Sequence, residues 1–176
     1  MIPLPSLTPN FAPNLVDAAA PEAQLAWMHS LGKKEMNALW EKGGKLTIDH
    51  FVNEPDTIVQ HEGQNSLLPG FDRFEKHFTQ RVGVVQGINV QFFSFVTGPG
   101  HFIAREEGDD VLFDYTVMPP DAPVGWPAVV PNDKGLSNLV YGGMIDVVRK
   151  VSTKICVGKA FRRGKDEGAF FMLYRR

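Results

Sequence analysis

The second half of the chain alternates hydrophobic and polar positions with the period of β-strands. Four stretches show this alternation, each bounded by glycine, proline or charged residues: residues 87–98, 101–118, 136–151 and 152–176. The short sequences "EEGDD", "YGG" and "RRGKDEG" within them are typical of hairpin turns. The pattern predicts about seven strands after residue 87, almost all joined to the next by a tight turn.

The first half begins with helical spacing. Residues 17–44 combine a capping residue, a proline near the first turn and apolar residues three or four apart, which predicts one helix or two short helices broken at Gly32. The stretches 45–52 and 56–63 then predict two short strands. Before Asp17, the prolines of residues 1–16 predict an extended arm and are not typical of a secretory signal.

Two further segments depart from the strand period. In residues 65–78 the aromatic residues Phe71, Phe74 and Phe78 recur at helical spacing with charged residues between them, which predicts a short amphipathic helix. Residues 119–135 contain five prolines and a tryptophan, so a long irregular loop is expected, serving as a lid or as a mobile excursion.

A meander of this many strands must protect its edges, and closure into a barrel does so most simply. We therefore expect a mainly β (α+β) fold: an antiparallel up-and-down β-barrel with an N-terminal helix, spanning residues 17–176 as a single domain. The apolar C-terminal strand would be covered on both sides. One face carries Ala169, Phe171, Leu173 and Arg175, and the other carries Phe170, Met172, Tyr174 and Arg176.

Composition and charge narrow the classes of function. A chain of 176 residues with 43% hydrophobic and 22% charged residues is an ordinary globular domain. A net charge of -2 without a long basic run argues against nucleic acid and anionic membranes as partners, and no apolar run is long enough for a spanning helix. The single cysteine, Cys156, lies in an apolar stretch, which favours a buried thiol in a reducing, cytoplasmic setting.

No motif indicates a metal or a cofactor, and none is expected. The five histidines, His29, His50, His61, His77 and His101, lack the spacing of a metal site. Phosphate-binding loops, nucleophile elbows and Cys-His pairs are absent from the sequence.

Two blocks of sequence resemble a family of small, largely uncharacterised lipocalin-like proteins that carry a Gly-x-Trp-x-x-Gly motif. The C-terminal block is "YGGMIDVVRKV", then Gly158 and "FFMLYRR"; the upstream block is "ALWEKG", "KLTIDH" and "RFEKHF", with Ala38 in place of the first glycine. The resemblance implies a barrel of eight to ten strands in which Trp40 is covered by Arg175. It also implies a shared role for His50 and His77 near the mouth of a cavity.

The first hypothesis is a binding module for a small apolar molecule, as a monomer or a homodimer. The faces of the hairpin 101–118 place Phe102, Phe113 and Tyr115 inward, and a barrel of about eight strands can be filled by side chains or hold one small ligand. The predicted ligand-binding residues are Phe93, Phe102, Phe113, Tyr115, Tyr141, Arg149, His50 and His77. Isomerase or cyclase activity on that ligand stays open.

One charged residue of the stretch 144–151 must be at least partly buried, because Arg149 shares a face with Ile145 and Val147, and Asp146 shares the other with Val148. A buried charge is costly unless it is paired. Either residue could contact a polar ligand group, or it could form a structural ion pair, which we favour.

The second hypothesis is an enzyme. Residues 56–78 also resemble the strand-turn-helix of the cone-shaped fold shared by polyketide cyclases and steroid isomerases, which move protons in an apolar cavity. That resemblance implies His61, Asp114 and Tyr115 as the catalytic residues, although the hairpin faces place Asp114 outward.

Overall fold

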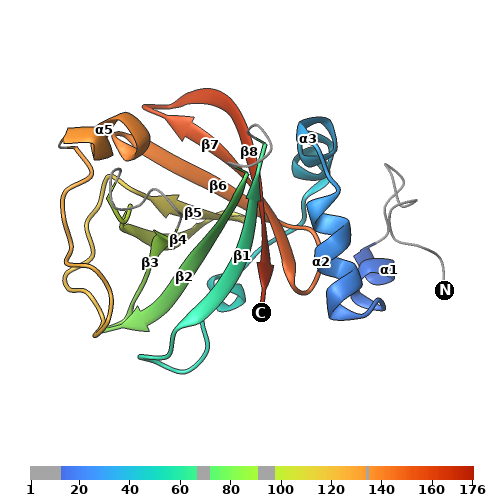
Figure 1. Cartoon of the computed structure of the whole chain (residues 1–176), viewed down its shortest axis with the longest axis horizontal. Helices are drawn as coiled ribbons and strands as arrows, with labels where there is room; N and C mark the ends of the chain where they lie inside the picture. The colour runs from blue at the N-terminus through green and yellow to red at the C-terminus, as the bar shows by residue number, and fades with distance from the viewer. Residues whose placement is uncertain (1–12, 67–71, 91–97, 134) are drawn as a thin grey trace.

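A closed β-barrel of eight antiparallel strands dominates the computed structural model, which describes residues 13–66, 72–90, 98–133 and 135–176 (Figure 1). Each strand pairs with the next one along the chain, and the last strand pairs with the first, so the predicted closure is confirmed. The strands are β1 (Val59–Asn65), β2 (Arg73–Arg81), β3 (Val84–Val90), β4 (Phe102–Glu107), β5 (Asp110–Asp114), β6 (Met144–Lys150), β7 (Ile155–Arg162) and β8 (Lys165–Arg175).

Three α-helices precede the barrel: α1 (Pro13–Asp17), α2 (Pro21–His29) and α3 (Lys33–Lys42). Of these, α2 and α3 lie against its outside beside β7 and β8 (Figure 1). Gly32 is the N-cap of α3, so the predicted break at this glycine is confirmed. Among the described residues, no helix has the length and apolar character needed to cross a bilayer.

The C-terminal strand β8 is covered on both faces, as its alternation predicts. Phe171 and Leu173 belong to the core inside the barrel, whereas Phe170, Met172 and Tyr174 pack against the helices. Met172 and Leu173 are fully buried although they lie four and three residues from the chain end. Strand β8 therefore contributes side chains both to the core inside the barrel and to the core between the barrel and the helices.

Three sequence predictions are wrong. Residues 45–52 form no strand; they contain the 3-10 helix η2 (Ile48–His50). The amphipathic helix predicted for 65–78 is strand β2 from residue 73 onward, because Phe74 and Phe78 also fit a period of two with Lys76 between them. Five strands, not seven, begin after residue 87 in the described part of the chain, since residues 135–141 form helix α5 (Gly135–Tyr141) instead.

The loop between β5 and α5 is irregular, as predicted, and is fastened to the barrel wall. The side-chain amide of Asn132 donates to the carbonyls of His101 (2.7 Å) and Tyr115 (2.9 Å). Arg81 pairs with Asp121 of the loop at 2.8 Å. These bonds hold the backbone of Tyr115 in place at the end of β5.

Aromatic side chains fill the end of the barrel that η2 covers. Phe51, which follows η2, contacts Phe78 and Phe113 at centroid distances of 4.8 and 5.1 Å. His50 and His61 join the same cluster, with ring centroids 5.7 Å apart. Among the residues that the structure describes, this end of the barrel is therefore closely packed by aromatic rings.

Three phenylalanine rings lie flat against the barrel wall, because each faces a glycine on the adjacent strand. The pairs are Gly63 with Phe74, Gly87 with Phe102, and Gly158 with Phe171. A Cβ atom on Gly158 would lie 2.1 Å from the ring of Phe171, so any larger residue would push that ring toward the barrel axis. These glycines leave room along the axis for other side chains.

The tryptophan predicted to pair with Arg175 stacks on a different arginine. The guanidinium carbon of Arg149 lies 3.9 Å from the ring centroid of Trp40, and Arg149 also bonds to Asp110 (3.0 Å). Arg175 instead donates to the carbonyls of Asp49 (3.0 Å) and Val52 next to η2. Arg149 fits because strand alternation puts it on the outer face of β6, toward α3, whereas Arg175 lies on the inner face of β8.

We predict that Trp40 and Arg149 are energetically coupled and that Trp40 and Arg175 are not. In a double-mutant cycle with alanine, measured by urea unfolding, the first pair should show a coupling of about 1 kcal/mol, the usual size of a partly exposed cation–π contact. The second pair should show about zero. Equal coupling in both cycles would contradict the assignment.

Candidate functional site

A cavity of about 190 Å³ lies at the end of the barrel next to α5. Antiparallel pairing brings the C-terminal ends of β1, β3, β5 and β7 to the same end of the barrel as the N-terminal parts of β2, β6 and β8. The residues that line the cavity come from these segments and from α5. The apolar walls include Phe74, Val140, Tyr141, Met144, Ala160, Ala169 and Phe171. The polar lining residues are Asn65, Ser66, Lys76, Asn89, Tyr115 and Asp146.

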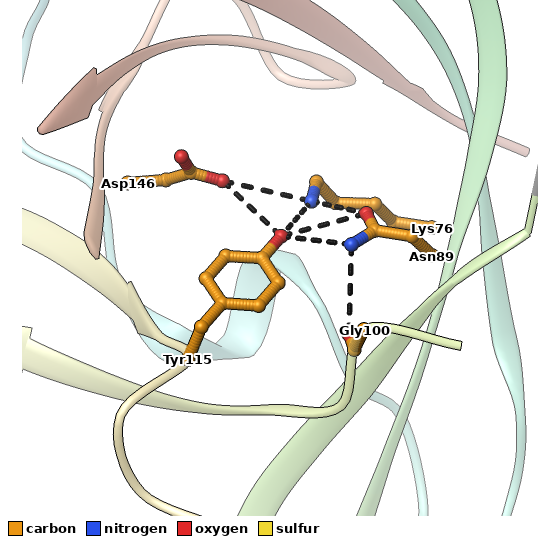
Figure 2. A network of polar contacts seen from close by, with 5 residues as sticks. All are labelled: Lys76, Asn89, Gly100, Tyr115 and Asp146. Atoms are coloured by element: carbon orange, nitrogen blue, oxygen red, sulfur yellow. Dashed lines mark hydrogen bonds and ion pairs between the residues drawn. The ribbon is translucent and has the colours of Figure 1, made fainter. Parts of the chain in front are cut away.

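Four of the polar residues form one network inside the barrel, each from a different strand or strand end (Figure 2). The Lys76 ammonium donates to the Asn89 side-chain oxygen and to the Tyr115 hydroxyl, both at 2.5 Å. Its third polar neighbour is Asp146 Oδ2 at 3.6 Å. Tyr115 lies 3.3 Å from the same carboxylate oxygen, to which it donates. The network thus joins a cation, an anion, a phenol and an amide.

Asn89 fixes the geometry of this network. Its side-chain nitrogen donates to the Tyr115 hydroxyl at 3.0 Å and to the carbonyl of Gly100 at 3.5 Å. Because the same amide accepts from Lys76, it cannot be turned over without placing an NH₂ group against the ammonium. Asn89 therefore orients both the lysine and the tyrosine.

Burial shifts the proton equilibria of the network. It lowers the pKa of Lys76 from 10.5 to about 8, although the negative charge of Asp146 opposes that shift. It raises the pKa of Asp146, with Lys76 opposing, and it raises the pKa of Tyr115 well above 10.0. At pH 7 the lysine is therefore mostly charged, but it can lose its proton near neutrality.

Aromatic rings also lie close to the ammonium of Lys76, which still lines the cavity. Five ring centroids lie between 4.9 and 5.6 Å from Nζ: those of Phe74, Phe102, Phe113, Tyr115 and Phe171. Rings at this distance attract a cation through their negative faces and exclude water. These five rings therefore stabilise a positive charge at the position of Nζ. To a molecule bound next to Nζ, the rings themselves offer apolar contacts.

The charged pair at the base of the cavity is suited to proton transfer and charge stabilisation on a bound molecule. Asp146 and Lys76 form a donor-acceptor pair, and both line the cavity. The second oxygen of Asp146 carries no contact within the network (Figure 2). Within the described residues, no three His, Cys, Asp or Glu side chains gather closely enough to hold a metal ion.

Four of the predicted ligand-binding residues lie inside the barrel near the network. Tyr115 and Tyr141 line the cavity and stack on each other at 5.3 Å. Phe102 and Phe113 lie beneath Lys76. Phe93 lies outside the described residues.

The other three are placed elsewhere. His50 lies in the packed cluster at the opposite end of the barrel. His77 is on the outer surface of β2, paired with Glu75 at 2.8 Å. Arg149 is on the outside of β6 against Trp40, in the structural ion pair with Asp110.

The residues of the acid/base hypothesis are not brought together. His61 is fully buried at the packed end of the barrel, between Phe51 and Phe78. Asp114 points outward, where it accepts from the Thr116 hydroxyl (2.6 Å) and lies 3.8 Å from Arg105. Only Tyr115 belongs to the cavity network. The closed sheet also differs from the open sheet of the cone fold.

Sequence reasoning missed Lys76, Asn89 and Phe74 as site residues. The helix predicted for residues 65–78 counts Lys76 among the charged residues between its phenylalanines, whereas β2 points Lys76 into the barrel with Phe74 and Phe78 on either side. The signal was present in the alternation "FEKHF", which places Phe74, Lys76 and Phe78 on one face of a strand. Asp146 was recognised as one of two candidates for burial, without its partner.

Comparison of the chain with protein-family models, with curated proteins and with solved structures finds no match. The function is therefore argued from the site itself.

Proposed function

We propose that the barrel binds one small, mainly apolar molecule whose single polar group reaches the network of Lys76, Asp146, Tyr115 and Asn89. The observation that carries the proposal is the cavity itself: an open space with apolar walls that ends on a buried polar network. Small-molecule sites combine these features, a mostly apolar lining and a few convergent polar groups. The proposal keeps the lipocalin-like interpretation of the barrel.

The size of the cavity limits the ligand. At about 190 Å³ it is smaller than the 300–1,000 Å³ typical of drug-sized sites, and slightly larger than the roughly 150 Å³ cavity that accepts benzene. The expected ligand is therefore a substituted benzene or an aliphatic molecule of that size. Its polar group would accept a hydrogen bond from Lys76 or Tyr115, or donate one to Asp146.

Catalysis by the network is the second candidate. The specific observation in its favour is the direct link between a lysine with a lowered pKa and a carboxyl with a raised pKa inside the cavity. Such a pair can take up and return a proton on a bound molecule, as an isomerase or cyclase requires. His61 and Asp114 have no part in this version.

Binding is tested by ¹⁹F NMR titration with fluorobenzene, 4-fluorophenol and 4-fluoroacetophenone. Wild-type protein should broaden the signals of the two polar probes more than that of fluorobenzene. Ala160→Phe places a ring in the cavity and should weaken binding by about tenfold or more. Ala18→Phe, on the exposed surface after α1, is the matched control and should bind as wild type.

Two results would oppose the proposal: no broadening of any probe, or equal broadening in Ala160→Phe and wild type. Circular dichroism of both variants verifies that they are folded.

A further inference from the structure

The amine of Lys76 is the only nitrogen nucleophile among the polar groups of the network. It lines the cavity, it is held by Asn89 and Tyr115, and its side chain is 3% exposed. Buried lysines next to a carboxyl group are suited to attack carbonyl carbon, because burial makes the neutral amine accessible near neutral pH. The other polar groups, an amide, a phenol and a carboxylate, do not form stable bonds to carbonyl compounds.

We propose that Lys76 forms an imine with a small apolar aldehyde or ketone held in the cavity. This inference rests on the proposed binding function and names its ligand class. A carbonyl compound fits the walls with its apolar body and the network with its oxygen, and the carbonyl carbon then lies next to Nζ.

The step balances within the network. Asp146 takes one proton from the Lys76 ammonium, and the neutral amine forms a C–N bond to the carbonyl carbon as the C–O π bond breaks. The nitrogen of this adduct then gives up one proton to the former carbonyl oxygen, so the adduct becomes a neutral carbinolamine and Asp146 keeps its own proton. The resulting carbinolamine loses its hydroxyl as water when Asp146 returns its proton, and the C–O bond breaks. The products are a protonated imine on Lys76, one water molecule and the Asp146 carboxylate, with no oxidant or reductant required.

The surroundings of Nζ stabilise the protonated imine. Asp146 remains as its counter-ion, and the five aromatic rings that face the ammonium would face the iminium nitrogen at the same position. Tyr115 can donate to the oxygen of the carbinolamine, because it lies 2.5 Å from Nζ and donates to Asp146 in the free protein. The cavity is open, so the water can leave.

Selectivity over surface lysines follows from the titration of the network. The titratable groups that face Lys76 are Asp146 from β6, Tyr115 after β5 and Cys156 from β7. Because burial lowers the pKa of Lys76 from 10.5 to about 8, a larger fraction of Lys76 than of an exposed lysine is neutral at pH 7. The nine other lysines of the chain should therefore react far more slowly.

The experiment is reductive trapping with benzaldehyde and sodium cyanoborohydride at pH 7, followed by intact-mass measurement and peptide mapping. We expect one benzyl group on Lys76, in addition to any on the α-amino group, whose pKa is comparable and which the peptide map tells apart. The labelling rate should rise with pH with a midpoint near 8, and Ala160→Phe should slow it by about tenfold or more, in line with weaker binding. Lys76→Met/Asp146→Leu, which removes both charges together, should not be labelled at this position.

The outcomes separate this inference from the proposed function. If benzaldehyde perturbs the Ala160 methyl signal in NMR but no adduct forms on Lys76, the imine is excluded and binding stands. If labelling is spread over exposed lysines with no preference for Lys76, the imine is likewise excluded. If benzaldehyde neither binds nor reacts, both proposals fail. Site mapping and the pH profile use wild-type protein, so the test holds even if a variant does not fold.

Discussion

Asp146→Asn is expected to destabilise the protein by about 3–5 kcal/mol at pH 7, measured by urea unfolding. The substitution removes the carboxylate that lies 3.6 Å from a buried ammonium, and a buried charge without its partner is costly. The loss should be larger at pH 6 than at pH 9. Without Asp146 the pKa of Lys76 in the folded protein falls further below 8, whereas in the unfolded chain it stays near 10.5. Between these two values the unfolded chain binds a proton that the folded protein does not, so stability declines with falling pH over a wider range.

The double variant Lys76→Met/Asp146→Leu should recover most of that stability, because it removes both charges and leaves Asn89 and Tyr115 hydrogen-bonded to each other at 3.0 Å. The matched control is Glu167→Gln, which breaks the half-exposed pair with Arg162 (3.3 Å) and should change stability by less than about 1 kcal/mol. If Asp146→Asn unfolds at the same urea concentration as wild type, the ion pair carries no stability.

Acid is expected to unfold the protein between pH 6.5 and about 4, through the histidines of the packed end. Burial lowers the pKa of His50 to about 4, helped by Arg175 and Lys150, and lowers that of His61 to about 3. As pH falls below 6.5, the unfolded chain takes up protons that the folded protein cannot, so stability declines by about 1.4 kcal/mol per pH unit for each histidine. At pH 5 the two together cost about 4 kcal/mol.

His61→Phe keeps a ring between Phe51 and Phe78 and should halve the slope of stability against pH in this range. It should not destabilise the protein at pH 7. Neither ring nitrogen of His61 makes a hydrogen bond of good geometry among the described residues, although the nearby backbone of His50 and Val59 partly opposes the fall of its pKa. Urea unfolding of both proteins from pH 4 to 8 measures this. An unchanged slope would mean that His61 is not an acid-labile group.

The barrel could be predicted from the sequence because its signals are local. The alternation in β5 and β8 sets which residues face inward, and the charged turns of the last two hairpins fix where the strands end. β2 was misassigned because phenylalanines at 74 and 78, four positions apart, fit both a helix and a strand, so periodicity alone does not decide. The helix α5 was misassigned because it is short and sits in the same stretch as the strand-like β6.

The site depends on distant pairings and was therefore harder to predict. Tyr115 followed from the faces of one hairpin, and the burial of a charge at 144–151 followed from an apolar pattern. That the charge is Asp146 and that its partner is Lys76, 70 positions upstream in sequence, depends on β2 and β6 facing each other across the barrel. The Trp40 partner was misassigned for a similar reason, since the choice between Arg149 and Arg175 depends on which face of its strand each occupies.

The measurement that tests the central claim most directly is the set of intermolecular nuclear Overhauser effects between bound 4-fluoroacetophenone and the protein's methyl groups. The account predicts contacts to Met144, Ala160 and Ala169, which line the cavity, and none to Ala104 in the filled part of the barrel. Contacts to Leu39 and Val151, which line a groove between α3 and the barrel, would place the ligand outside and contradict the account.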